Sequence, residues 1–396
     1  MTAWKKYTVE QLIDLDMLEA PMDGNHGSIH PKASDYVLTG VPFIMVNDMS
    51  NGHVDLKNCV FISEKQVGTL RKGFAKPGDV LLSHKATIGR TAIVPNDFDT
   101  IILTPQITYY RVKKGIDNRF LKYYFDSPNF QILFNTWAGS GSTRAYLGIT
   151  AQRKLPIILP ELDEQIKIAD ILSSIDKKID KNNAINNNLE QQAQAIYQQM
   201  FIDNASSDWT EGTLSDIADI TMGQSPSGSS YNEDSNGTIF FQGRAEFGFR
   251  FQTVRLYTSE PKRMACANDT LMSVRAPVGD LNVAHTDCCI GRGLAAIHSK
   301  NNHQSFVLYT MFSLKKQLDV FNGEGTVFGS INRNSLNEIP LLIPSSEKLD
   351  EFEELVAPMD AAIRNNYDEI CRLEQLRDSL LPKLMSGELD VSDIDL

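Results

Sequence analysis

The sequence lacks both a membrane-spanning stretch and a paired-cysteine pattern. No apolar run approaches the roughly 18 residues needed to cross a bilayer, and residues 1–6 lack the apolar core of a signal peptide. The cysteines form no CxxC motif and have no histidine at ligand spacing: Cys59, Cys266, Cys288, Cys289 and Cys371. We therefore expect a cytoplasmic protein with unpaired thiols and no metal site.

Catalytic signatures are also missing. The chain has no GxxxxGK[ST] loop, no HExxH, no GxSxG and no Asn/Asp-Pro-Pro-Tyr/Phe motif. Residues 291–296 fit the loose GxGxxA dinucleotide pattern, but no helix and no acidic ribose ligand follow, so we interpret them as a structural turn. His84 and His285 lie near strand-like segments, where a structural role outweighs a catalytic one. We predict no catalytic residue and no cofactor bound by this chain.

The net charge of −12 is unevenly distributed over the 396 residues. Residues 1–160 carry 18 basic and 14 acidic side chains, and residues 209–344 carry 11 and 13. The intervening residues 161–208 carry 4 and 9, and residues 345–396 carry 5 and 14. Most of the acidity therefore belongs to two short segments, and a local basic face on each larger segment is compatible with nucleic acid as a partner.

The chain contains an internal repeat. Residues 156–201 match residues 340–385 without a gap, so that Ile175-Asp176 falls on Met359-Asp360 and Asn182 on Asn366. A weaker echo pairs residues 79–89 with residues 269–279 and places Lys85 opposite Arg275. A doubled unit predicts a molecule that recognises two of something.

Both repeated stretches have the pattern of a long helix with a narrow apolar seam. The 3-4 spacing is that of a coiled coil, and the cheapest cover for each seam is the other copy, which favours an antiparallel pair. The predicted seam comprises Ile168, Leu172, Ile175, Ile179, Asn182, Leu189 and Ile196 on one helix and Met359, Ile363, Asn366, Leu373 and Leu380 on the other. The two asparagines either fix the register or lie exposed on frayed helices. Pro358 should kink the second helix or delay its start, and Pro382 should end or bend it.

Short segments rich in β-branched and aromatic residues precede each long helix. They predict strands at 41–46, 79–83, 91–94, 107–112, 238–241, 270–274 and 294–297, with helices at 120–134 and 306–321, each followed by a Gly-rich loop. The expected fold class is mixed α/β, with two modules in a pseudo-two-fold arrangement separated by a long antiparallel two-helix coiled coil. The expected divisions are a first module 1–155, a central long helix 156–203, a second module 204–339, a C-terminal long helix 340–388 and an acidic, frayed tail 389–396.

Donor-rich loops on two modules suit recognition of a two-part target. Arginine and lysine can contact base edges and phosphates, and the candidates in turn-like surroundings are Lys85, Arg90, Arg144, Arg244, Arg275, Arg292 and Arg333. For each one, an ordinary solvated surface charge is the competing interpretation. Two other functional classes stay open: an adaptor whose modules bind proteins, and an enzyme such as a methyltransferase.

Several strings resemble the specificity subunit of type I restriction–modification systems. They are Lys76-Pro-Gly-Asp-Val-Leu-Leu-Ser83 with Ile88-Gly89, Leu155-Pro-Ile-Ile-Leu-Pro160 before Glu164-Gln165, and the ending Leu380-Leu-Pro-Lys-Leu-Met-Ser-Gly-Glu388. The resemblance covers essentially the whole chain. It departs from the family where Lys348-Leu349 replaces an expected second Glu-Gln and where Pro358 interrupts the helix, which affects how symmetrically the two ends engage partners.

The resemblance implies a non-catalytic, DNA-reading subunit of a bacterial or archaeal cell. Each module would be a target-recognition domain for one half of an asymmetric bipartite site in double-stranded DNA, and the helices would set the spacer. In such complexes the helices dock two methyltransferase subunits, which use S-adenosylmethionine, and two restriction subunits that use ATP and Mg can join. Deleting residues 189–195 should then change the spacer, and exchanging residues 1–150 should change one half-site.

Overall fold

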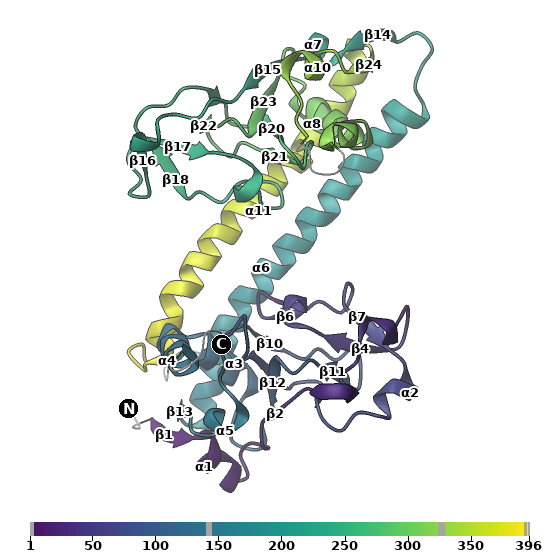
Figure 1. The fold of residues 1–396 in the computed structure, drawn as a ribbon. Helices are drawn as coiled ribbons and strands as arrows, with labels where there is room; N and C mark the ends of the chain where they lie inside the picture. Colours follow the sequence, from purple (N-terminus) through teal and green to yellow (C-terminus); the bar gives the residue numbers. More distant parts are fainter. Residues whose placement is uncertain (1–3, 140–144, 324–328, 392–393, 395–396) are drawn as a thin grey trace. The chain divides into compact units, whose positions relative to one another are not determined.

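A computed structural model describes residues 4–139, 145–323, 329–391 and 394. The chain divides into two compact units, namely unit 1, residues 1–180 with 370–396, and unit 2, residues 181–369. Each unit contains one sheet-rich module and a segment of each of two long helices (Figure 1). Among the described residues, no helix is long and apolar enough to cross a membrane.

The described residues of the unit 1 module form three sheets and one small hairpin. A two-stranded sheet pairs β1 (Lys5–Thr8) with β13 (Pro156–Leu159). A four-stranded sheet has the order β10 (Thr91–Ile93), β9 (Val80–Ser83), β12 (Ile107–Tyr110), β2 (Met22–Asp23). A five-stranded sheet has the order β3 (Tyr36–Val37), β7 (Val60–Ile62), β4 (Val41–Ile44), β11 (Ile101–Leu103), β8 (Phe74–Ala75). The hairpin pairs β5 (Met49–Ser50) with β6 (His53–Val54).

Unit 2 repeats these three sheets strand for strand. β14 (Thr210–Thr213) pairs with β24 (Pro340–Ile343). The four-stranded sheet has the order β21 (Leu281–Val283), β20 (Thr270–Ser273), β23 (Leu294–Ser299), β15 (Ala218–Met222). The five-stranded sheet has the order β16 (Tyr231–Asn232), β18 (Leu256–Thr258), β17 (Thr238–Phe241), β22 (Cys288–Ile290), β19 (Met264–Ala265). The predicted mixed α/β class is confirmed, because β4–β11 and β17–β22 are parallel while the pairs around them are antiparallel.

The equivalence extends to single hydrogen bonds. The side chain of Ser83, at the end of β9, accepts from the backbone N–H of Arg90 at 2.8 Å. Ser273, at the end of β20, accepts in the same way from Asp280 at 2.9 Å. The glycine before each of these residues, Gly89 or Gly279, donates to the carbonyl of the same serine. The two chain segments therefore make the same turn, and their residues can be compared position by position.

Short helices lie around the sheets of each module. In unit 1 they are α1 (Val9–Asp14), α2 (Glu64–Val67), α3 (Asn118–Asp126), α4 (Pro128–Gly139) and α5 (Ile149–Gln152), with 3-10 turns η1 (Gly27–Ile29), η2 (Ala33–Asp35) and η3 (Val46–Asp48). In unit 2 they are α7 (Leu214–Ile217), α8 (Gln304–Ser313), α9 (Lys315–Leu318) and α10 (Arg333–Asn337), with η5 (Gly228–Ser230), η6 (Arg244–Glu246) and η7 (Asp319–Asn322). One helix of each module packs on its four-stranded sheet, α3 against β9 and β10 and α8 against β20 and β23.

The prediction of single helices at 120–134 and 306–321 was wrong in one respect. The first is broken at Ser127, whose backbone is extended because it precedes Pro128. The second ends at Leu314 and continues as the short α9 and η7. The Gly-rich loops predicted after them lie largely outside the described residues.

Two long helices follow the modules, α6 (Leu162–Tyr197) and α11 (Ser346–Met385). A π-helical segment, η4 (Gln198–Asp203), continues α6. In unit 1, Ile175 and Ile179 of α6 pack with Ile370 of α11, and Leu373 and Leu380 lie against that cluster. In unit 2, Ala193 and Tyr197 of α6 share a core with Phe352 and Val356 of α11. Later residues of α6 pack against earlier residues of α11, so the two helix segments in each unit run antiparallel.

The predicted seam is buried over most of its length. Ile168, Leu172, Asn182 and Ile363 are at most 1% exposed, and Leu189, Ile196, Met359, Asn366, Leu373 and Leu380 are half-buried. Asn182 donates to Glu369 Oε2 at 2.7 Å, and Asn366 donates to Asn186 Oδ1 at 2.8 Å. These bonds connect α6 to α11. The alternative in which the asparagines lie exposed on frayed helices therefore does not describe them. Near the end of α6 the buried positions become Tyr197 and Phe201, so Ile196 lies beside the buried face.

The two prolines of α11 neither delay nor end the helix. α11 begins at Ser346, twelve positions before Pro358, and continues past Pro382 to Met385. Each proline removes one backbone hydrogen bond. Burial of Phe352, Val356 and Ile363 on the flanking turns offsets the loss at Pro358. The expected frayed tail also needs correction, because Val391 is fully buried in the core of unit 1 and Ile394 packs against it.

Candidate nucleic-acid interface

In each unit, loops that follow three strands meet at one edge of the module. We define crest 1 as residues 24–27, 84–87, 104–106 and 145–147, and crest 2 as residues 223–226, 274–277, 291–293 and 329–331. In crest 1, the backbone N–H of His84 donates to Gln106, and that of Leu147 donates to His84. In crest 2, Val274 donates to Gly293, and Ile331 donates to Val274. Backbone bonds therefore fix both crests in the same way.

One glycine in each crest is required by a close approach of two backbones. A Cβ on Gly24 would lie 1.9 Å from the carbonyl oxygen of Leu103. A Cβ on Gly223 would lie 2.1 Å from the carbonyl oxygen of Gly291. Only a residue without a side chain fits at either position. These glycines therefore hold the loop after β2 or β15 against its neighbour.

Crest 1 presents Lys85 over an aromatic ring. Lys85 is exposed, forms an isolated bridge with Tyr146, and holds its ammonium group 5.9 Å from the centre of that ring. His84 beside it is fully buried, and its Nδ1 lies 3.1 Å from the carbonyl oxygen of Leu147. Burial lowers the pKa of His84 from 6.5 to about 4. His84 is therefore a neutral structural residue, and Lys85 supplies the charge.

The polar side chains of the loop after β2 bond to other residues of the module. His26 lies 2.8 Å from the buried carboxylate of Asp23, which also pairs with Lys72. Burial alone would raise the pKa of Asp23, but the bonds from Lys72 and His26 lower it below its ordinary value. Asn25 is buried, donates to the carbonyl of Lys72 and accepts from Arg71 at 2.9 Å. These side chains fasten the loop after β2.

Crest 2 presents two arginines, Arg275 and Arg292. Both are exposed, and Arg275 forms an isolated bridge with Ser330, as Lys85 does with Tyr146. The Nε of Arg275 donates to the carbonyl of Arg292 at 3.4 Å. The backbone of Arg292 donates to the hydroxyl of Ser225 at 3.2 Å. Of the stretch 291–296, Arg292 and Gly293 form a turn and residues 294–296 begin strand β23, so no helix follows the glycines.

Arg90 and Arg244 make internal contacts beside the crests. Arg90 donates to the carbonyls of Val46 at 3.1 Å and Met49 at 3.3 Å. Its equivalent in unit 2 is Asp280, which pairs with Arg244 at 2.6 Å. In unit 1 the cation Arg90 holds the 3-10 segment after β4. In unit 2 the anion Asp280, at the equivalent position, holds the 3-10 segment after β17. A contact of Arg90 or Arg244 with DNA stays a prediction.

The remaining two candidates do not join a crest in the described structure. Arg333 is the exposed first residue of α10, which Asn332 caps by accepting from Ser335 at 3.0 Å. Arg144 lies outside the described residues. The candidates that lie in a crest are therefore Lys85 in unit 1 and the adjacent Arg275 and Arg292 in unit 2.

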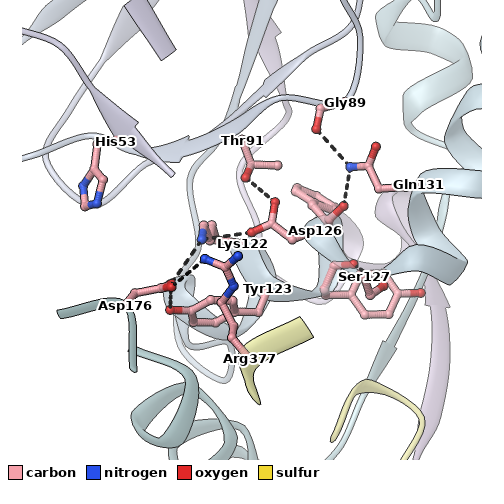
Figure 2. A network of polar contacts seen from close by, with 12 residues as sticks. His53, Gly89, Thr91, Lys122, Tyr123, Asp126, Ser127, Gln131, Asp176 and Arg377 are labelled. Carbon is pink, nitrogen blue, oxygen red and sulfur yellow. Dashed lines mark hydrogen bonds and ion pairs between the residues drawn. The ribbon is translucent and has the colours of Figure 1, made fainter. Parts of the chain in front are cut away.

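A polar network in unit 1 joins the module to both long helices (Figure 2). Asp176 of α6 accepts from the hydroxyl of Tyr123 on α3 at 2.6 Å and from Arg377 of α11 at 3.2 Å. Lys122 lies 3.7 Å from Asp176 and 2.9 Å from Asp126, which also accepts from Thr91 of β10. Burial, and after it the negative charge of the Asp176 carboxylate, raise the pKa of Tyr123. The network therefore fixes how the module packs on its helices.

Unit 2 has the corresponding joint with a different cation. Asp360 of α11 accepts from Tyr309 on α8 at 2.9 Å and from Arg250 at 3.2 Å. Arg250 is 4% exposed and also pairs with Glu190 of α6 at 3.0 Å. Burial raises the pKa of Glu190 above its ordinary value, although Arg250 acts in the opposite direction. Here the module supplies the arginine that α11 supplies in unit 1.

Sequence reasoning did not identify these joints. The alignment of Ile175-Asp176 with Met359-Asp360 was the available signal, since a repeated acidic residue on an apolar helix face needs a partner. The partners Tyr123 and Tyr309 come from helices far away in sequence. Arg377 lies four positions after Leu373 and three before Leu380, which is the spacing of the predicted seam, and a charge there could have been interpreted as an ion-pairing residue.

Comparison with known proteins adds an independent finding. Residues 2–191 and 206–369 match the model of the "Type I restriction modification DNA specificity domain". A Methanocaldococcus jannaschii protein named as the specificity subunit of the type I restriction enzyme MjaX is 28% identical over 374 residues, covering 89% of this chain and 88% of that protein. The HindI specificity subunit of Haemophilus influenzae is 22% identical over 442 residues, covering 88% and 94%.

A solved structure shares the fold. The crystal structure of a type I restriction–modification system S subunit from M. genitalium matches with a TM-score of 0.61 and 16% identity, and the match covers 96% of each chain. At this identity the likeness shows the fold alone. It agrees with the two sheet-rich halves and the long helices described above.

Proposed function

Because the chain belongs to the type I restriction modification DNA specificity family, we propose that its two modules each read one half of an asymmetric bipartite site in double-stranded DNA. The observation that carries this proposal is the equivalence of the two crests. Each module presents a cation at the same place after its β9-type strand, Lys85 or Arg275, on loops that backbone bonds hold in place. Rigid loops with exposed donors suit contacts to phosphates and base edges.

The family of specificity subunits is non-catalytic and has no catalytic cofactor of its own. We infer that the chemistry belongs to partners that assemble on this chain. These are two methyltransferase subunits, which use S-adenosylmethionine to methylate adenine, and two restriction subunits that use ATP and Mg. The target adenine would be flipped into the partner's pocket.

We infer that α6 and α11 dock the methyltransferase subunits and set the spacer between the half-sites. The acidity of these helices supports contact with protein rather than with phosphate. The bonds of Asn182 with Glu369 and of Asn366 with Asn186 would fix the register of the pair and with it the spacer length. The family match does not favour the adaptor alternative.

Exchange of the first module tests the proposal. Residues 1–150 are replaced by those of another family member, and the methylated motif is mapped in cells that express the chain with its methyltransferase. We expect one half of the motif to change while the other half and the spacer stay the same. Altered bases in both halves would contradict modular reading. Strong binding of the complex to a protein ligand, without salt-sensitive DNA binding, would favour the adaptor.

A further inference from the structure

Arg275 presents an oriented guanidinium at the exposed face of crest 2. Its Nε donates a long hydrogen bond of 3.4 Å to the carbonyl oxygen of Arg292, which orients the guanidinium. The backbone on both sides is also fixed, because Val274 donates to Gly293 and Ala276 donates to Gly329 at 3.0 Å. The two terminal amino groups of the guanidinium remain as a pair of parallel donors. An arginine restrained in this way loses little entropy when it binds a planar partner.

The charge of Arg275 is not used inside the described part of unit 2. The ion pairs found among the described residues do not include it, whereas Arg244, Arg250 and Arg255 each pair with a carboxylate there. Arg275 is exposed, as are Gln224 of crest 2 and Gln242, whose backbone carbonyl accepts from Gly293 of the crest at 3.2 Å. Arginine matches the O6 and N7 acceptors of guanine, and glutamine matches adenine. Crest 2 thus carries donors that distinguish purines in the major groove.

Crest 1 has different residues at the equivalent positions. Lys85 takes the place of Arg275, Pro105 takes that of Arg292, and the buried Asn25 takes that of Gln224. A lysine is a point charge and lacks the fork that fits guanine at two atoms. A shared phosphate contact requires only a positive charge, which both crests supply. The rigid fork is a feature of crest 2.

We propose that Arg275 reads a guanine in the half-site bound by the second module, donating from its two amino groups to O6 and N7. The proposal rests on the proposed function and names the base class that one residue selects. Arg292 positions the fork through its carbonyl. A bidentate pair of this kind discriminates against other bases by about 5- to 150-fold.

The test uses the full chain in complex with its methyltransferase. Mapping of methylated motifs first gives the bipartite site, and exchange of residues 1–150 identifies the half that belongs to the second module. Duplexes are then made in which each guanine of that half is replaced singly by 7-deazaguanine, which pairs normally but lacks the N7 acceptor. Binding to each duplex is measured for the unaltered chain, Arg275→Lys and Arg275→Ala. Arg255→Lys, at an exposed ion-paired arginine of the same unit, is the control.

We expect one 7-deazaguanine position to weaken binding of the unaltered chain by about tenfold and to have no effect on Arg275→Ala. Arg275→Lys should accept other bases at that position in the methylated motif, while the first half-site stays unchanged and shows that the complex is assembled. Arg255→Lys should behave as the unaltered chain. Two results would overturn the proposal: a second half-site without a G·C pair, or a loss of affinity that is equal for all sequences, which indicates a phosphate contact. Absence of any bipartite motif from the unaltered chain would instead refute the proposed function.

Discussion

Asp176 and Asp360 hold the same position in the two copies of the repeat, and each accepts a hydrogen bond from a tyrosine of its own module. The donors are Tyr123 at 2.6 Å and Tyr309 at 2.9 Å. The arginine that completes each joint comes from a different element, Arg377 of α11 in unit 1 and Arg250 of the module in unit 2. The tyrosine–aspartate pair is thus common to both joints, while the source of the cation differs.

Neutralising these aspartates should destabilise the two units unequally. Asp360→Asn leaves Arg250, which is 4% exposed, with only Glu190 as a charged partner, so we expect a loss of about 2–4 kcal/mol in unit 2. Asp176→Asn leaves Arg377, which is 30% exposed, with Asp378 as a partner, and it leaves Lys122 with Asp126, so we expect about 1–2 kcal/mol in unit 1. Urea unfolding followed by hydrogen exchange of peptides from α8 and α3 measures each unit separately. Glu374→Gln, at an exposed residue of α11 in unit 1, is the control, and an equal or larger loss for Asp176→Asn would contradict this account.

Burial of His84 predicts a pH-dependent stability of unit 1. Its pKa is about 4 in the folded chain and 6.5 in the unfolded chain, so between these values the unfolded chain binds a proton that the folded chain does not. Stability from this residue is therefore present above pH 6.5 and is lost as the pH falls toward 4, by about 2 kcal/mol at pH 5. Hydrogen exchange of β9 and β12 peptides in urea at pH 7 and pH 5 measures the change. In His84→Gln the difference between the two pH values should shrink by that amount, and an unchanged difference would show that His84 does not cause it.

The close approaches at Gly24 and Gly223 predict paired defects. Alanine at either position places a Cβ within 2.1 Å of a carbonyl oxygen, so the loop must shift, at a cost of about 1–3 kcal/mol. We expect Gly24→Ala to weaken recognition of one half-site and Gly223→Ala to weaken recognition of the other. Binding to duplexes altered in one half at a time measures this. Gly243→Ala, where a Cβ meets nothing within 4 Å, should bind normally, and loss of both half-sites in either crest variant would count against separate modules.

The ruler role of the helices can be tested without disturbing a joint. Residues 189–195 include Glu190, a partner of Arg250, so deleting that heptad would also damage the joint of unit 2. Inserting one heptad after Asp180 and another after Glu369 lengthens both helices at the boundary of the two units and keeps the contacts within each unit. Seven residues add about 10 Å, so the methylated motif should gain a spacer of about three base pairs. An unchanged spacer with unchanged half-sites would refute the ruler role.

The sequence predicted the repeat, the long helices and most core strands, because these depend on periodicity and local composition. β17 was predicted at its observed bounds, and β9, β10, β12 and β20 were predicted within one or two residues. The hairpin β5–β6 was not predicted, since two-residue strands carry no periodic signal. The continuity of α11 through Pro358 depends on tertiary packing, which local propensity does not report.

The candidate site was predictable only in part. The weaker echo placed Lys85 opposite Arg275, and the two residues do occupy equivalent bridges. Composition could not separate Arg275 from Arg90 or Arg244, because the internal contacts of those two depend on loops far away in sequence. The joint around Arg250 was missed for the same reason, since Glu190, Tyr309 and Asp360 meet only in the folded unit.

Single-molecule mapping of N6-methyladenine tests the central claim most directly. DNA is compared from cells that express this chain with its methyltransferase partner and from cells that lack only this chain. The account predicts one bipartite motif that is methylated in the first cells and unmethylated in the second. An identical methylation pattern in both, with expression and assembly of the complex verified, would contradict the claim that this chain selects the DNA sequence.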